Sequence, residues 1–165
     1  EGANLMGEPV KKRMHLSDIA LIRAYAGLRF CTDRETKARK LSLQEFRERF
    51  PLLWKPHMVM NYYVNLADPE NVKLGFYKVD HTPKSRRWTY IRGRVKRFIA
   101  QLGAQDAWRP LIYGGKFELT IITAVEDKVT ALKREFEEDD EIPRHVRIGY
   151  YVVPDLLPLI APQPR

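Results

Sequence analysis

The amino-acid sequence predicts one α/β domain in which a β-hairpin and later β-α-β crossovers form a mixed central sheet with helices packed on its faces. Three observations predict this class. The chain of 165 residues suits one domain, and its 44% hydrophobic and 11% aromatic content allows a sizeable core. Two neighbouring strand-like runs are joined by a short turn, and strand-like and helix-like segments alternate after them. We expect a flexible segment at 1–14, the domain at 15–153 and a Pro-rich tail at 154–165.

Two helices are expected before the hairpin. Residues 15–26 carry apolar side chains at helical spacing, with Ser17 as a start signal: Leu16, Ile19, Ile22 and Ala26. A second, short helix is expected from Ser42, its N-cap, through Phe50, because Glu45 occupies the capping-box position. The proline that follows ends this helix.

Four segments have the composition of strands. Met58–Leu66 and Val72–Asp80 are rich in Val, Tyr and Phe, and the Ala-Asp-Pro-Glu-Asn connection at 67–71 predicts an antiparallel hairpin. Phe117–Ala124 is nearly continuous in apolar and β-branched residues, which is typical of a buried central strand. A last strand is expected at Val146–Val153.

Helical segments separate these strands. Thr82–Ser85 is expected to break the second strand and to open a long helix that ends near Gly103. Its core-facing residues recur at helical spacing: Trp88, Ile91, Val95, Phe98 and Leu102. Residues 104–115 are predicted to be a short helix or loop. A helix from Glu126 to about Glu138 follows, with one apolar face: Val125, Val129, Leu132 and Phe136.

Basic side chains concentrate on the long predicted helix. The net charge of +8 and pI of about 9.6 favour a polyanionic partner, with nucleic acid ahead of an acidic protein or a membrane surface. Lys84–Arg97 contains seven basic residues and no acid. Arg86, Tyr90, Gly93 and Arg97 are expected to line its solvent side. Together with the flanking and adjacent positions they give the nucleic-acid-binding candidates: Lys84, Arg86, Arg87, Tyr90, Arg92, Arg94, Lys96 and Arg97.

The acidic run Glu135–Glu141 offers the basic helix a different role. It holds six acids in seven residues and is expected to be a solvated helix end. Metal binding is not expected there, because consecutive carboxylates point in different directions around a helix. The alternative is that this run pairs with Lys84–Arg97 inside the protein, which would make the basic helix a solubilising element.

Other features exclude several classes of site. Cys31 is the single cysteine, which excludes an intrachain disulfide and a thiolate metal cluster, and we expect it to be a small buried hydrophobe. The histidines form no zinc-type pair, and no P-loop, dinucleotide fingerprint or Gly-x-Ser-x-Gly elbow occurs. We expect a cytoplasmic protein without a membrane partner, because no apolar run could span a bilayer and no signal peptide is present. The chain begins at Glu1 rather than at methionine, which is typical of an added segment or of a piece of a longer chain.

The order of elements carries a family resemblance. Lys55-Pro56-His57 precedes the hairpin, Leu74-Gly75-Phe76-Tyr77-Lys78-Val79-Asp80 lies in its second strand, and the helix through Arg94–Phe98 leads to the strand Phe117–Ala124 and a further helix. This order, over roughly residues 43–153, resembles that of plasmid replication-relaxation and MobC-like mobilisation proteins, which look like relatives of the PD-(D/E)xK nuclease fold. The resemblance implies a restriction-endonuclease-like fold in a protein of a plasmid or integrative mobile element.

The chain departs from that pattern at the catalytic positions. The pattern has a Pro-Asp at the start of the hairpin and an acid-x-acid or acid-x-Lys element at its end, whereas this chain has His57 at the first place and Lys78-Val79-Asp80 at the second. Paired carboxylates hold the divalent ion that activates water, and a lysine among them repels it. Catalysis is therefore uncertain and not favoured. The enzymatic alternative is a metal-dependent nuclease that uses Asp80 and Glu118, with His57 as a further candidate; Mg²⁺ is expected only in that case, and otherwise no cofactor or metal.

The sequence thus predicts a DNA-binding, catalytically degenerate nuclease-like domain that acts in mobilisation, replication or regulation. Its basic helix would hold phosphates electrostatically. A third hypothesis is a protein-interaction module of a relaxosome-type or regulatory complex, in which the apolar tail Leu156–Ile160 or the acidic run meets a partner such as a relaxase.

Overall fold

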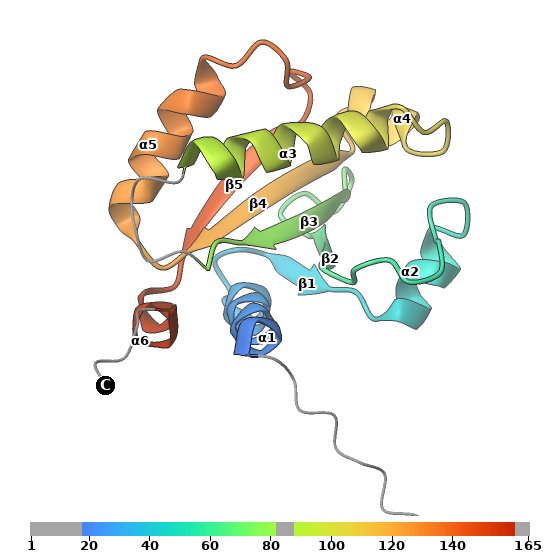
Figure 1. The fold of residues 1–165 in the computed structure, drawn as a ribbon. Helices are drawn as coiled ribbons and strands as arrows, with labels where there is room; N and C mark the ends of the chain where they lie inside the picture. Colours follow the sequence, from blue (N-terminus) through green and yellow to red (C-terminus); the bar gives the residue numbers. More distant parts are fainter. Residues whose placement is uncertain (1–17, 82–87, 161–165) are drawn as a thin grey trace, which may run out of the picture.

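A five-stranded mixed sheet forms the centre of the molecule (Figure 1). The computed structural model describes residues 18–81 and 88–160. The strands lie side by side in chain order: β1 (Ala38–Lys40), β2 (Tyr62–Asn65), β3 (Lys73–Val79), β4 (Phe117–Thr123) and β5 (Arg147–Val152). β1, β2 and β3 pair antiparallel, whereas β3, β4 and β5 pair parallel. The predicted hairpin is confirmed in β2 and β3, and the sheet is mixed as expected.

Helices cover both faces of this sheet (Figure 1). The helices are α1 (Asp18–Thr32), α2 (Leu43–Arg49), α3 (Trp88–Gly103), α4 (Arg109–Tyr113), α5 (Glu126–Glu137) and α6 (Leu157–Ile160). A 3₁₀ turn, η2 (Pro154–Leu156), precedes α6. α3, α4 and α5 lie on one face, and α1 and α6 lie on the other. The result is an α/β domain with the helix–sheet–helix layering that the sequence predicts.

Each face of the sheet buries its own core. On the α3 face, Val95 packs with apolar residues of β4 such as Leu119. On the α1 face, Ala26 and Phe30 pack with Tyr63 and other residues of the sheet. Every residue of β4 is buried, which confirms the prediction of a central strand.

The N-terminal elements differ in part from expectation. β1 was not predicted, because three residues of sequence Ala-Arg-Lys show no strand pattern. α1 extends to Thr32, beyond the predicted end near Ala26, because Phe30 continues the buried stripe of Ile22 and Ala26. Ile19, which was expected to face the core, is 44% exposed.

Local sequence signals are accurate in α2 and α3. Ser42 and Glu45 form the predicted capping box at the start of α2. In α3 the core-facing residues include the predicted Ile91, Val95 and Leu102. Ile99 is also buried there, and the predicted Phe98 is half-buried.

Part of the predicted Pro-rich tail is folded. Residues 154–160 form η2 and α6, and Leu156 is fully buried in the core of the α1 face. The predicted segment 1–14 lies outside the described residues, as do the candidates Lys84, Arg86 and Arg87. In the part of the chain that the structure describes, no helix is long and apolar enough to cross a membrane.

Candidate nucleic-acid interface

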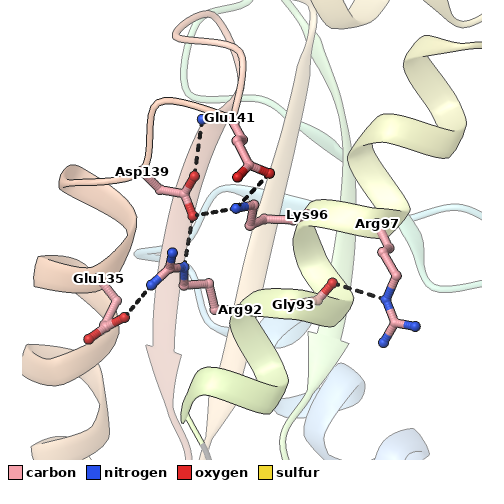
Figure 2. Close-up of polar contacts among 7 residues, drawn as sticks. All are labelled: Arg92, Gly93, Lys96, Arg97, Glu135, Asp139 and Glu141. Atoms are coloured by element: carbon pink, nitrogen blue, oxygen red, sulfur yellow. Dashed lines mark hydrogen bonds and ion pairs between the residues drawn. The ribbon is translucent and has the colours of Figure 1, made fainter.

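Two basic residues of α3, Arg92 and Lys96, are ion-paired with the acidic run Glu135–Glu141, which begins in the last turn of α5 (Figure 2). The Arg92 guanidinium lies 2.6 Å from Glu135 and 2.8 Å from Asp139. The Lys96 ammonium lies 3.2 Å from Asp139 and 2.8 Å from Glu141. We call these five residues the charge clasp, since they join α3 to the C-terminal end of α5.

Asp139 is the centre of the charge clasp. Its side chain is only 2% exposed and contacts both cations. Burial by itself would raise the Asp139 pKa, but a hydrogen bond from the Glu141 backbone N–H and the contacts with Lys96 and Arg92 outweigh it and lower that pKa. The prediction that the acidic run is a solvated helix end is therefore wrong for Asp139. The internal pairing that was left open as an alternative holds for Arg92 and Lys96.

Two other cations of α3 make no such pairs. Arg94 lies over the Tyr90 ring, with 5.4 Å between the guanidinium carbon and the ring centroid. Arg97 is exposed, and its Nε donates a hydrogen bond to the Gly93 carbonyl at 3.3 Å. Figure 2 shows the Arg97 side chain directed away from the charge clasp. Among the described residues, no carboxylate lies within 4.0 Å of Arg94 or Arg97.

Lys78 on β3 joins these arginines. Its side chain is half-buried, and its ammonium lies 5.8 Å from the Phe98 ring centroid. Burial, followed by the positive charges of Arg94, Arg23 and Arg97, lowers the Lys78 pKa to about 8. Three guanidinium groups on two helices are therefore close enough to repel the Lys78 ammonium. We call Arg23, Lys78, Arg94 and Arg97 the cation cluster.

Three members of the cation cluster, Arg23, Lys78 and Arg94, line a groove of about 330 Å³ where α1, β3 and α3 approach one another. The groove is lined by Arg23, Met58, Val59, Asn61, Tyr62, Phe76, Lys78, Val79, His81, Arg94 and Phe98. A smaller cavity of about 160 Å³ adjoins it and shares Lys78, His81 and Arg94. The His81 Nδ1 atom is buried and has no hydrogen-bond partner among the described residues. The site therefore combines several positive charges with an apolar wall and polar groups.

Sequence reasoning missed two members of the cation cluster. Arg23 was not singled out, because an isolated arginine on an amphipathic helix carries no motif. Lys78 was considered only as a residue that would repel a catalytic metal. The available signal was its position near the end of β3, just before the basic segment that leads into α3.

The nuclease candidates do not form one site. Asp80 is buried and ion-paired with Lys128 of α5 at 2.6 Å. Glu118 lies at the opposite end of the sheet, because its neighbour on β3 is Gly75, five residues before Asp80. At roughly 3.3 Å per residue the backbone positions of Asp80 and Glu118 are about 16 Å apart along the strand direction. One metal ion cannot contact both, so the predicted Asp80–Glu118 pair is wrong.

His57 does not change this outcome. It is exposed in the turn before β2 and has a left-handed backbone with φ of 62°. Within residues 18–81 and 88–160, no three His, Cys, Asp or Glu side chains are grouped as ligands of a metal ion would be.

Grouped cations without carboxylate partners can hold successive oxyanions, since each guanidinium donates several hydrogen bonds in one plane. Tyr90, which is 54% exposed beside Arg94, adds a ring on the solvent side.

Comparison of the chain with protein-family models, with curated proteins and with solved structures gives no match.

Proposed function

We propose that this chain is a DNA-binding domain whose cation cluster holds phosphate groups of the backbone. The observation that carries the proposal is the convergence of Arg23, Lys78 and Arg94 on one groove, with no ion-paired carboxylate among the described residues. Arg97 is near enough to add its positive charge to theirs. A protein that needed these charges only for solubility would gain nothing from placing them against one another. Phosphate oxygens relieve the repulsion among them.

The charge clasp supports this assignment by contrast. Arg92 and Lys96 pair with three of the six acids of the run, Glu135, Asp139 and Glu141. Figure 2 shows Arg97 directed away from these carboxylates. The remaining cations then form one patch instead of a uniformly basic helix. Such a patch attracts a polyanion without base-specific readout, because phosphate contacts position a protein but do not read sequence.

The fold family and the biological role of the domain are also part of the proposal. The resemblance to PD-(D/E)xK relatives rests on the order of a hairpin, a basic helix, a buried strand and a further helix, and β2–β3, α3, β4 and α5 follow one another in that order. We infer a restriction-endonuclease-like domain that serves mobilisation, replication or regulation in a plasmid or integrative element. Asp80, the one retained acid, is paired with Lys128, which favours binding over metal-dependent cleavage.

Fluorescence anisotropy with labelled DNA across a salt series tests the proposal. If the four members of the cation cluster each neutralise one phosphate, log Kd rises against log salt concentration with a slope of about 3.6 on duplex DNA. Lys78→Gln should lower that slope by about 1. Arg34→Gln, which removes an exposed charge from the α1–β1 loop at the other end of α1, is the matched control and should leave the slope unchanged. An affinity that barely responds to salt would contradict the proposal.

A further inference from the structure

On the α1 face of the sheet, away from the cation cluster, the Glu118 carboxylate lies at the floor of a polar cavity. Glu118 is only 5% exposed. Its Oε1 atom accepts a hydrogen bond from the Tyr63 hydroxyl at 2.8 Å and another from the Asn65 amide at 2.8 Å. The Tyr63 hydroxyl also contacts the Thr120 hydroxyl at 2.8 Å. These partners are neutral, so they orient the carboxylate and do not cancel its charge.

Among the described residues, Glu118 has no ion-pair partner, although Arg147 lines the same cavity. No Lys, Arg or His group of the described residues lies within 4.0 Å of the Glu118 carboxylate. Arg147 is its neighbour on β5, but its side chain is exposed and makes no ion pair with Glu118 at that distance. A buried carboxylate without a cation destabilises a fold. The buried Glu118 carboxylate is therefore not explained by the stability of the fold.

The cavity above Glu118 has a defined shape. It measures about 210 Å³ and is lined by Phe30, Glu35, Thr36, Asn65, Glu118, Thr120, Arg147, Gly149, Tyr150 and Tyr151. The ring centroids of Phe30 and Tyr151 lie 5.3 Å apart. The Tyr151 hydroxyl donates to Asp33 at 2.7 Å, which fastens the α1–β1 loop over the sheet.

Two glycines beside Glu118 and Thr120 shape this floor. A Cβ on Gly75 would collide with the Tyr63 ring, which crosses this position on its way to Glu118. A Cβ on Gly149 would lie 3.1 Å from the Thr120 hydroxyl oxygen. Gly75 therefore makes room for the Tyr63 ring, and Gly149 leaves space in the cavity beside Thr120.

We propose that this cavity binds a small organic cation through a primary ammonium group. An ammonium has three donors, and the cavity offers acceptors at the Glu118 carboxylate, at the Thr120 hydroxyl and at Glu35 on its rim. The aromatic rings on its wall add cation–π attraction. A divalent metal suits the site less well, because the described residues around it hold no group of three metal-ligating side chains. The cavity and the groove share no lining residue, and Lys78 lies on the α3 face of the sheet, beside Phe98.

Amide chemical shifts of the ¹⁵N-labelled full chain, titrated at pH 7, test the proposal. The probe is n-propylamine, 1-propanol is the neutral control of similar size, and Mg²⁺ and Ca²⁺ form separate arms. The amine should shift the amides of Glu35, Thr120 and Gly149 to saturation, and the alcohol should not. Glu118→Gln keeps both acceptor contacts but removes the charge, so it should weaken amine binding at least about tenfold.

Melting temperatures of the variants show whether a loss of amine binding comes from unfolding. In the absence of amine, Glu118→Gln should raise the melting temperature or leave it unchanged, because it removes a buried charge. Gly149→Ala, which narrows the cavity and leaves Glu118 in place, should also weaken amine binding. Equal shifts with propanol, unaltered amine binding by Glu118→Gln, or saturation only by the metal ions would overturn the proposal.

Discussion

Helix α3 presents two pairs of cations that the fold uses in different ways. Arg92 and Lys96 lie one turn apart and pair with the acidic run. Arg94 and Arg97 lie on another side of the same helix, where Arg94 lines the groove with Lys78 and the charges of both arginines lower the Lys78 pKa. The four residues are close in sequence and chemically similar. What separates them is the rotation of about 100° per residue along a helix. A basic segment is therefore not a uniform surface, and the opposing element decides which of its charges remain available.

The largest expected effect concerns another paired cation, Lys128 of α5, in its buried ion pair with Asp80 beside the smaller cavity. Both side chains are nearly inaccessible, and they are 2.6 Å apart. Lys128→Met leaves the Asp80 carboxylate without this partner, so the free energy of unfolding should fall by about 3–5 kcal/mol in urea denaturation. Asp80→Asn/Lys128→Met, which removes both charges, should lose distinctly less. An equal or larger loss in the double variant would show that the pair is not coupled.

The charge clasp should respond more mildly. Asp139→Asn removes the carboxylate that Arg92 and Lys96 share, and we expect the free energy of unfolding to fall by about 1–2 kcal/mol. DNA affinity should not fall, because the change frees positive charge instead of removing it. A loss of DNA affinity at constant folding would mean that the charge clasp forms part of the interface.

Lys78 of the cation cluster should make both the free energy of unfolding and the DNA affinity depend on pH. The Lys78 pKa of about 8 lies below the ordinary value of 10.5, so between these pH values the unfolded chain binds one more proton than the folded chain. Stability therefore rises with pH across this window, and protonated Lys78 costs stability below it. DNA affinity should fall over the same window, because Lys78 loses its charge.

Lys78→Gln isolates this effect from other titrating groups. The difference in free energy of unfolding between wild type and Lys78→Gln should shift in favour of wild type from pH 7 to pH 10, and the pH dependence of DNA affinity above pH 8 should diminish. If wild type and variant respond identically to pH, Lys78 titrates normally and the cation cluster is not as close as described.

The smallest expected effect is at Gly93, between the two pairs. A Cβ there would meet no atom within 4 Å, and the position lies inside a helix. Gly93→Ala should therefore raise the free energy of unfolding by roughly 0.5–1 kcal/mol in urea denaturation. A weaker affinity for DNA in the same variant would indicate that a phosphate approaches the backbone at this point. Destabilisation would contradict the open environment of Gly93.

Local signals predicted much of the fold. The capping box at Ser42 depends on residues three apart, and β4 is a run of seven residues that is apolar enough to need burial on both sides. β1 lacked such a signal, because its pairing with β2 supplies the order that its three residues do not encode. Helices and strands could thus be predicted wherever one segment of the sequence contained the whole pattern.

The candidate site was harder to predict from the sequence, because its geometry depends on residues that are far apart along the chain. Arg92 and Glu135 are 43 residues apart, so the sequence raised their pairing only as an alternative. Arg23 and Lys78 become neighbours of Arg94 only when α1 and α3 pack on opposite sides of the sheet. Asp80 and Glu118 both lie at core strands as expected, yet the register of β3 against β4 separates them. Charge content was predictable, and the partner of each charge was not.

The most direct test of the account compares two double variants with the same change in net charge on the same helix. Arg94→Gln/Arg97→Gln should weaken DNA binding by about tenfold or more at low salt, lower the salt slope by about 2 and leave the urea midpoint nearly unchanged. Arg92→Gln/Lys96→Gln should lower the urea midpoint and leave the salt slope close to that of wild type. An equal loss of DNA affinity in both variants, with equal stability, would show that only net charge matters and would contradict the division of α3 into a structural side and a binding side.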